Sequence, residues 1–332
     1  MNVPENWLRD FVDWKIPVEK LSHLLTMSGL EVESCEPVSP PFKGVVAGKI
    51  LSVEPHPNAA KLTVCTVDTG TQKLQVVCGA PNVRAGMLVP LALVGAKLKS
   101  LEIKKSSVRG VQSIGMLCSS RELGLSDDHS GLLELTPQAR PGENLRRVLE
   151  LDERVLRFKL TPNRADCLSI LGIAREVAAL TGTKLKKLQF EKIPAKNKAR
   201  HAFRISAPEG CGRFAGRVIR NVNSAAATPH WMRQRLERAG QRSISALVDV
   251  TNYVMLELGR PLHVYDQDKL RGPVDVRWGR KGEKVLLLNG EQVEVDGTVL
   301  CITDDSGALG LGGIMGGAST NAETTTKNLF LE

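Results

Sequence analysis

The sequence lacks the features that would anchor it in a membrane or stabilise it with disulfide bonds. No apolar run approaches the ~20 residues needed to span a bilayer, and the N-terminus lacks the apolar core of a signal peptide. The seven cysteines are scattered, odd in number and never spaced as Cys-x-x-Cys. They indicate reduced thiols in a cytoplasmic protein, and we expect no disulfide framework or metal site.

Short motifs for nucleotide binding and hydrolysis are also missing. Residues 44–50 resemble a phosphate-binding loop, but they have three intervening residues rather than four and lack the Ser/Thr. Residues 310–315 fail the dinucleotide fingerprint at its last position. No Gly-x-Ser-x-Gly, His-Glu-x-x-His or calcium-loop pattern occurs. We therefore expect this chain to hold no cofactor of its own.

Charge of one sign predominates. The 45 Lys and Arg residues exceed the 36 Asp and Glu residues, which gives a formal charge of +9 and favours a polyanionic partner. The 332 residues, 42% of them hydrophobic, suffice for two or three soluble domains.

The first part of the chain predicts two helices followed by a small barrel. Apolar residues 7, 8, 11 and 12 have helical spacing, and a second helical pattern runs from Val18 until Gly29 ends it. After prolines 37, 40 and 41, strand patterns follow at 45–53, 62–67 and 74–78. Such spacing suggests a closed barrel of the OB type.

This predicted barrel contains cations that could follow a phosphate backbone. Aromatic residues are almost absent there, so strong sequence reading of single-stranded RNA is not expected. The candidate RNA contacts are Lys61, Arg84, Lys97, Lys104, Lys105 and Arg109.

A mixed α/β pattern returns near Pro141. A helix is predicted over 170–180, with Asp166 as its expected cap and Arg164 in an internal salt bridge. Residues 184–204 are strongly basic, which fits either a solvated linker or an RNA contact. A further helix is expected to begin at Thr228-Pro229.

The last part of the chain contains the candidate pocket. Residues 242–266 alternate between apolar and polar residues, which predicts a strand with polar side chains on one face. His263 follows Gly259 and Pro261, so we expect its imidazole on a rigid turn. The glycine-rich run 312–317 permits close backbone approach. Together with Arg242 and Glu332 these residues could line a small polar pocket, unless His263 is simply a core histidine.

Three ordered motifs in this last part resemble the editing domain of the bacterial phenylalanyl-tRNA synthetase β subunit: residues 246–254, 259–263 and 312–317. The resemblance implies that Glu332 receives the hydroxyl of a tyrosyl substrate, that His263 and Arg242 position substrate or water, and that Gly316 keeps the pocket open. Ser243 and Ser245 depart from the family's usual proline and asparagine. Residues 56–62, 78–82 and 108–119 resemble the tRNA-binding OB module of several synthetases, with Ala60 in place of the usual aspartate.

The resemblance implies an α+β multidomain protein. A small split α/β domain would occupy 1–39 and 151–190, with an OB-fold tRNA-binding module inserted at 40–150. A basic linker at 191–204 would lead to a mixed α+β editing domain of B3/B4 type at 205–332. Because the chain stops at Glu332 inside a strand pattern, we expect that domain to be cut short.

The implied function is that of the N-terminal part of a phenylalanine–tRNA ligase β subunit. It would bind tRNA(Phe) and hydrolyse mischarged Tyr-tRNA(Phe) in the cytoplasm, without membrane or DNA partners. Aminoacylation, with ATP and Mg²⁺, would belong to a partner α subunit in an α2β2 heterotetramer, so this chain alone should not aminoacylate. The alternatives are a free-standing aminoacyl-tRNA deacylase and a non-catalytic RNA-binding scaffold.

Overall fold

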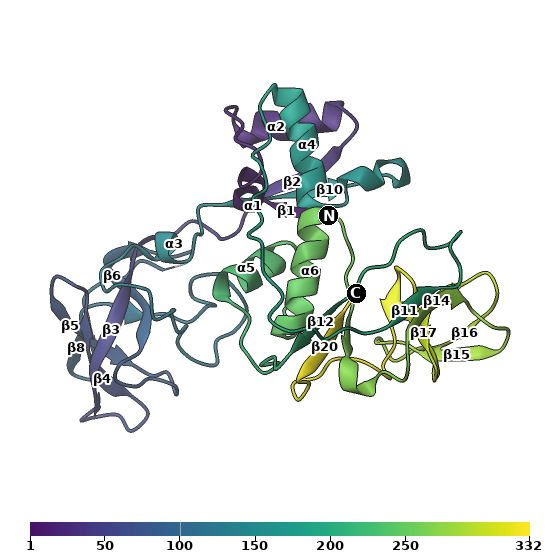
Figure 1. The fold of residues 1–332 in the computed structure, drawn as a ribbon. Coiled ribbons are helices and arrows are strands. Elements are labelled where there is room, and N and C mark those ends of the chain that lie inside the picture. The colour runs from purple at the N-terminus through teal and green to yellow at the C-terminus, as the bar shows by residue number, and fades with distance from the viewer. Residues whose placement is uncertain (100) are drawn as a thin grey trace. The chain divides into compact units, whose positions relative to one another are not determined.

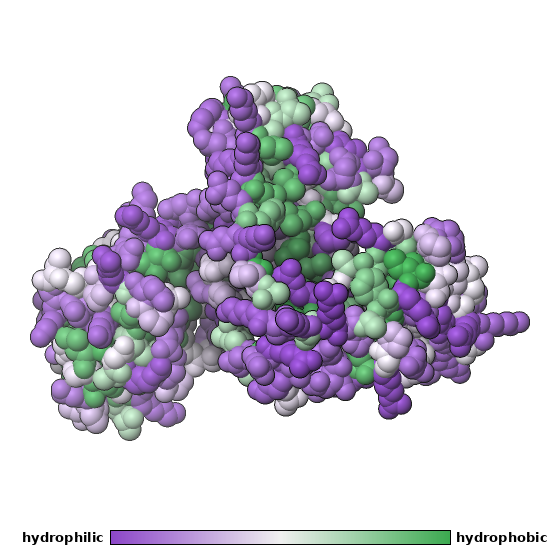
Figure 2. Space-filling model, viewed as in Figure 1, coloured by the Kyte–Doolittle hydropathy of each residue, from purple (hydrophilic) through white to green (hydrophobic). Residues whose placement is uncertain are grey.

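A computed structural model describes residues 1–99 and 101–332. The chain forms two compact units (Figure 1). The first unit comprises Met1–Cys35 and Val155–Glu332, and the second comprises Glu36–Arg154. Hydrophilic residues cover much of the visible face of each unit, and hydrophobic residues form smaller patches on that face (Figure 2). In the described ranges no helix is long and apolar enough to cross a membrane. The expected mixture of α and β structure is confirmed, while the domain boundaries stay predictions.

The second unit is built on an antiparallel sheet of five strands in the order β5-β4-β3-β6-β9. Register shifts at Ile50/Ser52 and Lys43/Val45 bend the long strand β3, because a bulge kinks one strand against its partner. The elements are β3 (Lys43–Pro55), β4 (Thr63–Asp68), β5 (Lys73–Cys78), β6 (Leu88–Lys97), the hairpin β7 (Ser106–Val108) and β8 (Val111–Ser113), β9 (Met116–Leu117) and α3 (Leu145–Val148). The three strands expected at 45–53, 62–67 and 74–78 are confirmed as β3, β4 and β5. The OB-type closure stays a prediction.

In the first unit, a three-stranded sheet in the order β1-β10-β2 packs with helices from both of the chain segments that form the unit. The buried Trp7, Leu8 and Phe11 join one core with residues of α4. The elements are β1 (Asn2–Pro4), α1 (Glu5–Arg9), α2 (Val18–Met27), β2 (Glu31–Pro37), β10 (Arg154–Lys159), the 3-10 helix η1 (Pro162–Cys167) and α4 (Ile170–Thr181). The two N-terminal helices and the helix expected at 170–180 are confirmed.

The expected cap of α4 was wrong. Ser169, not Asp166, caps the helix, and its Oγ accepts a hydrogen bond from the backbone N of Gly172 at 2.9 Å. Ser169 directly precedes the first helical residue, which is the position from which a side chain reaches the free N–H groups. Asp166 lies earlier, within η1, and bonds Arg164 instead. The internal salt bridge expected for Arg164 is confirmed.

The remainder of the first unit contains two sheets, a hairpin, two α-helices and one short 3-10 helix. A five-stranded sheet has the order β11-β14-β17-β18-β19, and a three-stranded antiparallel sheet has the order β12-β20-β13. The elements are β11 (Phe203–Ile205), β12 (Arg217–Arg220), α5 (His230–Arg238), α6 (Ala246–Leu258), β13 (Val264–Asp266), η2 (Gln267–Lys269), β14 (Val274–Trp278), β15 (Glu283–Leu286), β16 (Gln292–Val295), β17 (Leu300–Asp304), β18 (Gly307–Leu311), β19 (Met315–Gly316) and β20 (Asn328–Leu331). The helix expected after Thr228-Pro229 is confirmed as α5.

The strand expected over 242–266 is wrong, because most of this stretch forms the helix α6. Ser245 caps its start, and Gly259 ends it in the left-handed conformation at φ 74°. Two residues four positions apart on this helix both contact Trp7. The Tyr253 ring stacks on the Trp7 ring with centroids 4.7 Å apart, and Glu257 accepts a hydrogen bond from Trp7 Nε1 at 2.8 Å. Caps and tertiary packing therefore outweigh the strand preference of the β-branched residues.

Candidate functional site

A cavity of about 310 Å³ lies in the first unit where β13, β20 and the β18–β19 turn converge. The backbone N of Glu332 donates to the carbonyl of His263 at 2.9 Å, so the β13–β20 pairing places these two residues side by side. Gly316 pairs with Gly310 across β18 and β19. The lining residues are Asn252, Met255, Pro261, Leu262, His263, Tyr265, Leu288, Ile302, Gly310, Leu311, Gly313, Ile314, Met315, Gly316 and Glu332.

Gly316 lies against the imidazole of His263. A Cβ added at Gly316 would lie 2.1 Å from Cε1 and 2.5 Å from Nε2 of His263. Real Cβ atoms do not approach other heavy atoms so closely, and the obstacle is a ring rather than the end of a flexible chain. Glycine at this position is therefore what allows His263 to occupy its place in the cavity wall.

The His263 imidazole contacts a second ring and has one nitrogen without a partner in the described part of the chain. Its ring meets the ring of Tyr265 edge-on, with centroids 4.5 Å apart. Its Nε2 is buried and has no hydrogen-bond partner among the described residues. Burial lowers the pKa of His263, so the ring is neutral at pH 7. A neutral imidazole with a free nitrogen can bind a water molecule or a polar substrate atom.

Glu332 supplies a partly buried carboxylate to the same cavity. The hydroxyl of Tyr265, a fully buried side chain, donates to Oε2 of Glu332 at 2.6 Å. Burial raises the pKa of Glu332, and the hydrogen bond from Tyr265 acts in the opposite direction. Burial and the nearby Glu332 together raise the pKa of Tyr265 well above its usual value. This carboxylate thus already binds one phenolic hydroxyl, and its second oxygen can accept another hydrogen bond.

The structure brings together three of the four residues expected in the pocket. Arg242 is exposed and is not among the described residues that line the cavity. Tyr265 and Asn252 line the cavity and were not singled out as pocket residues from the sequence. Tyr265 lies two residues after His263 at the start of a strand, and this period-two spacing is a signal that could have identified it.

The depressed pKa of His263 predicts an acid-sensitive contribution to stability. Below pH 6.5 the unfolded chain binds a proton that the folded chain refuses until its own lower pKa, so stability rises with pH through this window. Urea unfolding between pH 5.5 and 7.5 should therefore show a smaller loss of stability on acidification for His263→Gln than for the parent. His23→Gln, which changes an exposed histidine, should match the parent. Equal pH dependence in the parent and His263→Gln would contradict the prediction.

The candidate RNA contacts in the second unit are all exposed, and they lie on several different elements. Asn58 Nδ2 donates to the carbonyl of Arg109 at 3.0 Å, which ties the loop carrying Lys61 to the β7–β8 turn. Lys104 and Lys105 directly precede β7. The remaining two differ: Arg84 is paired with Glu134 at 2.6 Å, and Lys97 ends β6.

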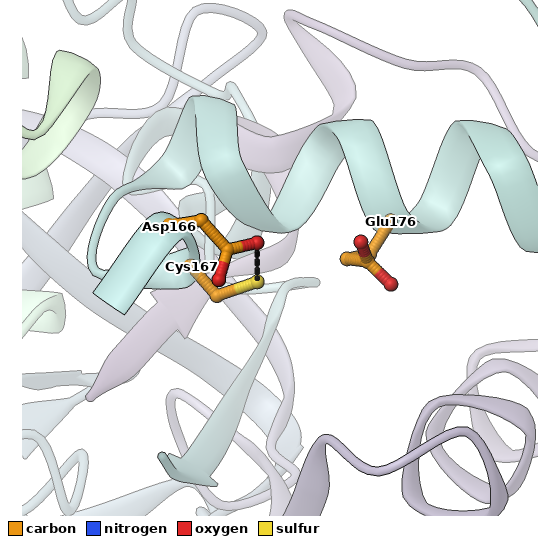
Figure 3. A group of neighbouring side chains, drawn as sticks. All are labelled: Asp166, Cys167 and Glu176. Carbon is orange, nitrogen blue, oxygen red and sulfur yellow. Dashed lines mark hydrogen bonds between the residues drawn. The ribbon is translucent and has the colours of Figure 1, made fainter. Parts of the chain in front are cut away.

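A cluster of side chains of the types that bind metals lies between η1 and the middle of α4 (Figure 3). It consists of Asp166, Cys167 and Glu176, whose ligand atoms lie within 4.8 Å of one another. The guanidinium of Arg164 bonds all three side chains: its Nη2 is 3.2 Å from Asp166, 3.0 Å from Cys167 and 3.0 Å from Glu176. Burial and the neighbouring Asp166 raise the Cys167 pKa to about 11, which keeps the thiol protonated. An arginine cation therefore already occupies the position that a metal ion would take.

Comparisons with known proteins assign two domains to the chain. The family described as B3/4 domain matches residues 210–332, and the family described as putative tRNA binding domain matches residues 45–144. The phenylalanine–tRNA ligase beta subunit of Bordetella pertussis is 56% identical over 334 residues, and that of Burkholderia pseudomallei is 55% identical over 340. Each match covers 100% of this chain and 42% of the relative.

A solved N-terminal fragment of the phenylalanyl-tRNA synthetase beta subunit from Pyrococcus horikoshii is 17% identical, with a TM-score of 0.31. That match covers 54% of this chain and 55% of the fragment. The sequence comparisons extend over the whole chain, and both matched domains agree with them. The chain therefore belongs to the phenylalanine–tRNA ligase beta subunit family and spans 42% of the length of the curated relatives that it matches.

Proposed function

We propose that this chain is the tRNA-binding and proofreading part of a phenylalanine–tRNA ligase and hydrolyses Tyr-tRNA(Phe). The observation that supports the proposal most directly is that His263, Gly316 and Glu332 line one cavity. His263 and Gly316 belong to two separate sequence motifs, at 259–263 and 312–317, and both motifs resemble the same editing domain.

The proposed chemistry is attack by water on the ester that links tyrosine to the tRNA ribose. Glu332 selects tyrosine by accepting its para-hydroxyl, because a buried acceptor left without a donor penalises phenylalanine. The hydrogen bond from Tyr265 to Glu332 supports this role, since it is the same kind of phenol–carboxylate contact. The unpartnered Nε2 of His263 suits a group that holds the attacking water or the substrate. Arg242 would assist from outside the present cavity wall.

Aminoacylation is proposed to lie elsewhere. The complete enzyme would use ATP and Mg²⁺ on a partner α subunit, in an α2β2 assembly in the cytoplasm. A free-standing deacylase would hydrolyse Tyr-tRNA without that partner, whereas an RNA-binding scaffold would not hydrolyse it at all. Hydrolysis measured with and without the α subunit separates these alternatives.

The first test of the proposal measures hydrolysis and synthesis side by side in a β subunit of the relatives' full length paired with α. His263→Ala should slow Tyr-tRNA(Phe) hydrolysis by roughly tenfold to a hundredfold, the lower part of the range for a positioned acid–base group. Glu332→Ala should reduce the preference for Tyr-tRNA over Phe-tRNA more than it reduces the rate. Phe-tRNA synthesis serves as the control and should continue in both variants. Clearance of Tyr-tRNA by both variants at the parent rate would return His263 to the role of a core histidine.

RNA binding by the second unit is tested by its dependence on salt. Reversing the charge of Lys61, Lys104, Lys105 and Arg109 should weaken tRNA binding and reduce the log–log salt slope by roughly three, because each phosphate contact contributes about 0.7–0.9. Arg84→Gln is the matched control and should have a smaller effect, since Glu134 already pairs with Arg84. An unchanged slope in the fourfold variant would place the RNA contact on other residues.

A further inference from the structure

A second and larger cavity, of about 570 Å³, forms a groove between the basic linker and β12 in the first unit. Figure 1 shows the linker passing β12 on its way from α4 to β11. We call this cavity the linker groove. Its lining residues are Ile193, Pro194, Ala195, Lys196, Asn197, Ala199, Arg200, His201, Phe203, Gly216, Arg217, Val218, Ile219, Arg220 and Phe330.

The linker groove presents positive charge without compensating acid. Lys196, Arg200, Arg217 and Arg220 line it, and its described lining contains no Asp or Glu. Within the described ranges none of these four cations forms an ion pair with a carboxylate.

A third cavity in the same unit provides the contrast. There Arg204 pairs with Asp275 at 2.9 Å, and Arg277 pairs with Glu283 at 2.7 Å. The four cations of the linker groove therefore remain available to a polyanion, whereas Arg204 and Arg277 of the third cavity are neutralised within the protein.

Ring systems also gather at the linker groove, although only 4% of the chain is Phe, Trp or Tyr. The His201 ring lies 5.0 Å from that of Phe330, and Phe203 is 44% exposed. Nε2 of His201 is buried and finds no hydrogen-bond partner in the described part of the chain, which is costly unless a ligand or water supplies one. Cations beside exposed rings are typical of surfaces that bind single-stranded nucleic acid, because unpaired bases stack on the rings.

The linker groove adjoins the candidate site through a single strand. Arg217 pairs with Leu331, the residue before Glu332, and neighbouring strands lie about 4.8 Å apart. Phe330 lines the groove and faces the ring of Tyr265 at 6.1 Å, and Tyr265 in turn bonds Glu332. An RNA strand whose terminal ester occupied the cavity at His263 would have this basic groove beside it.

We propose that the linker groove binds the single-stranded 3′ end of the tRNA whose ester occupies that cavity. Arg200 and Arg217 contact its phosphates, and the exposed Phe203 offers a stacking surface to an unpaired base. The inference rests on the proposed function in one respect: the proposed function is the reason for placing the 3′ end, rather than another part of the RNA, in the groove. The binding itself does not require hydrolysis.

The test uses the 332-residue chain and an RNA hairpin that carries no amino acid and ends in a single-stranded 3′ extension. Arg200→Gln with Arg217→Gln should weaken binding and lower the log–log salt slope by roughly 1.4, the contribution of two single-strand phosphate contacts. Arg200→Lys with Arg217→Lys keeps the charge and should retain most of the slope. Arg280→Gln with Lys281→Gln removes two exposed cations from the third cavity and should bind as the parent does.

The parent and the glutamine variant should bind the same hairpin without its 3′ extension with equal affinity and equal salt slope. An unchanged slope, or an equal loss with the blunt hairpin, would overturn the proposal. Stronger competition by polyglutamate than by unlabelled RNA of equal charge would also overturn it and would identify the groove as a docking site for an acidic protein segment. The RNA carries no amino acid, so this test measures binding separately from hydrolysis. If the glutamine variant has the lower salt slope but Tyr-tRNA is not hydrolysed, the proposed function is contradicted and the proposal for the groove is not.

Discussion

Gly316→Ala is expected to slow the hydrolysis of Tyr-tRNA(Phe) by about a hundredfold or more. The added methyl group would lie 2.1 Å from Cε1 of His263, so the imidazole or the β18–β19 turn must move by more than 1 Å to restore ordinary contact. A displacement of about 1 Å at a reacting group can cost on the order of a hundredfold in rate. Deacylation of Tyr-tRNA(Phe) by a subunit of full length, in single-turnover conditions, measures the effect.

The matched control is Gly297→Ala, because a Cβ at Gly297 meets nothing within 4 Å and that backbone is not left-handed. It should hydrolyse Tyr-tRNA at the parent rate. Gly316→Trp should fill the cavity as well as displace the ring, so it should be no more active than Gly316→Ala. Full activity in Gly316→Ala would mean that the position of His263 in the cavity wall does not matter for the reaction.

The parts of the candidate site that the sequence predicts are those carried by short motifs. His263 follows a turn signal, and Gly316 belongs to a glycine-rich run, so each was recognisable without knowledge of its neighbour. What could not be derived from spacing is that Gly316 touches the His263 ring, because that contact depends on β13 and β19 from two different sheets. Tyr265 was missed for a related reason: a buried tyrosine resembles an ordinary core residue until its hydroxyl partner is known.

The wrong strand over 242–266 shows how local preference can mislead. Val248, Val250 and Val254 favour a strand when they are considered alone. The helix is decided by Ser245 and Gly259 at its ends and by Trp7, which lies more than 240 residues away and meets both Tyr253 and Glu257. The basic linker is a similar case, since its charge is visible in the sequence but its position beside β12 is not.

The second large effect concerns the fully buried Asp249 in α6. Its Oδ2 accepts hydrogen bonds from the hydroxyls of Thr228 and of Ser243, the latter at 2.6 Å, and its Oδ1 accepts one from the backbone N of Ile244 at 2.9 Å. One carboxylate thus holds the segment before α5 and the segment before α6. Removing it leaves several donors without a partner, so Asp249→Ala should lower the free energy of unfolding of the first unit by about 2–4 kcal/mol.

The four tryptophans make this prediction measurable for the first unit alone, because residues 7, 14, 231 and 278 all belong to it. Urea unfolding followed by tryptophan fluorescence should therefore show the full loss for Asp249→Ala. Asp249→Asn keeps an oxygen for the backbone N of Ile244, and the two hydroxyls can turn to accept from its amide, so it should lose about half as much or less. Glu237→Ala, on the exposed face of α5, should stay within about 0.5 kcal/mol of the parent, since its contact with Arg233 is long and solvated. If Asp249→Ala unfolds at the same urea concentration as Glu237→Ala, this carboxylate does not anchor the two segments, and Arg242, which directly precedes Ser243, would not depend on it for its position.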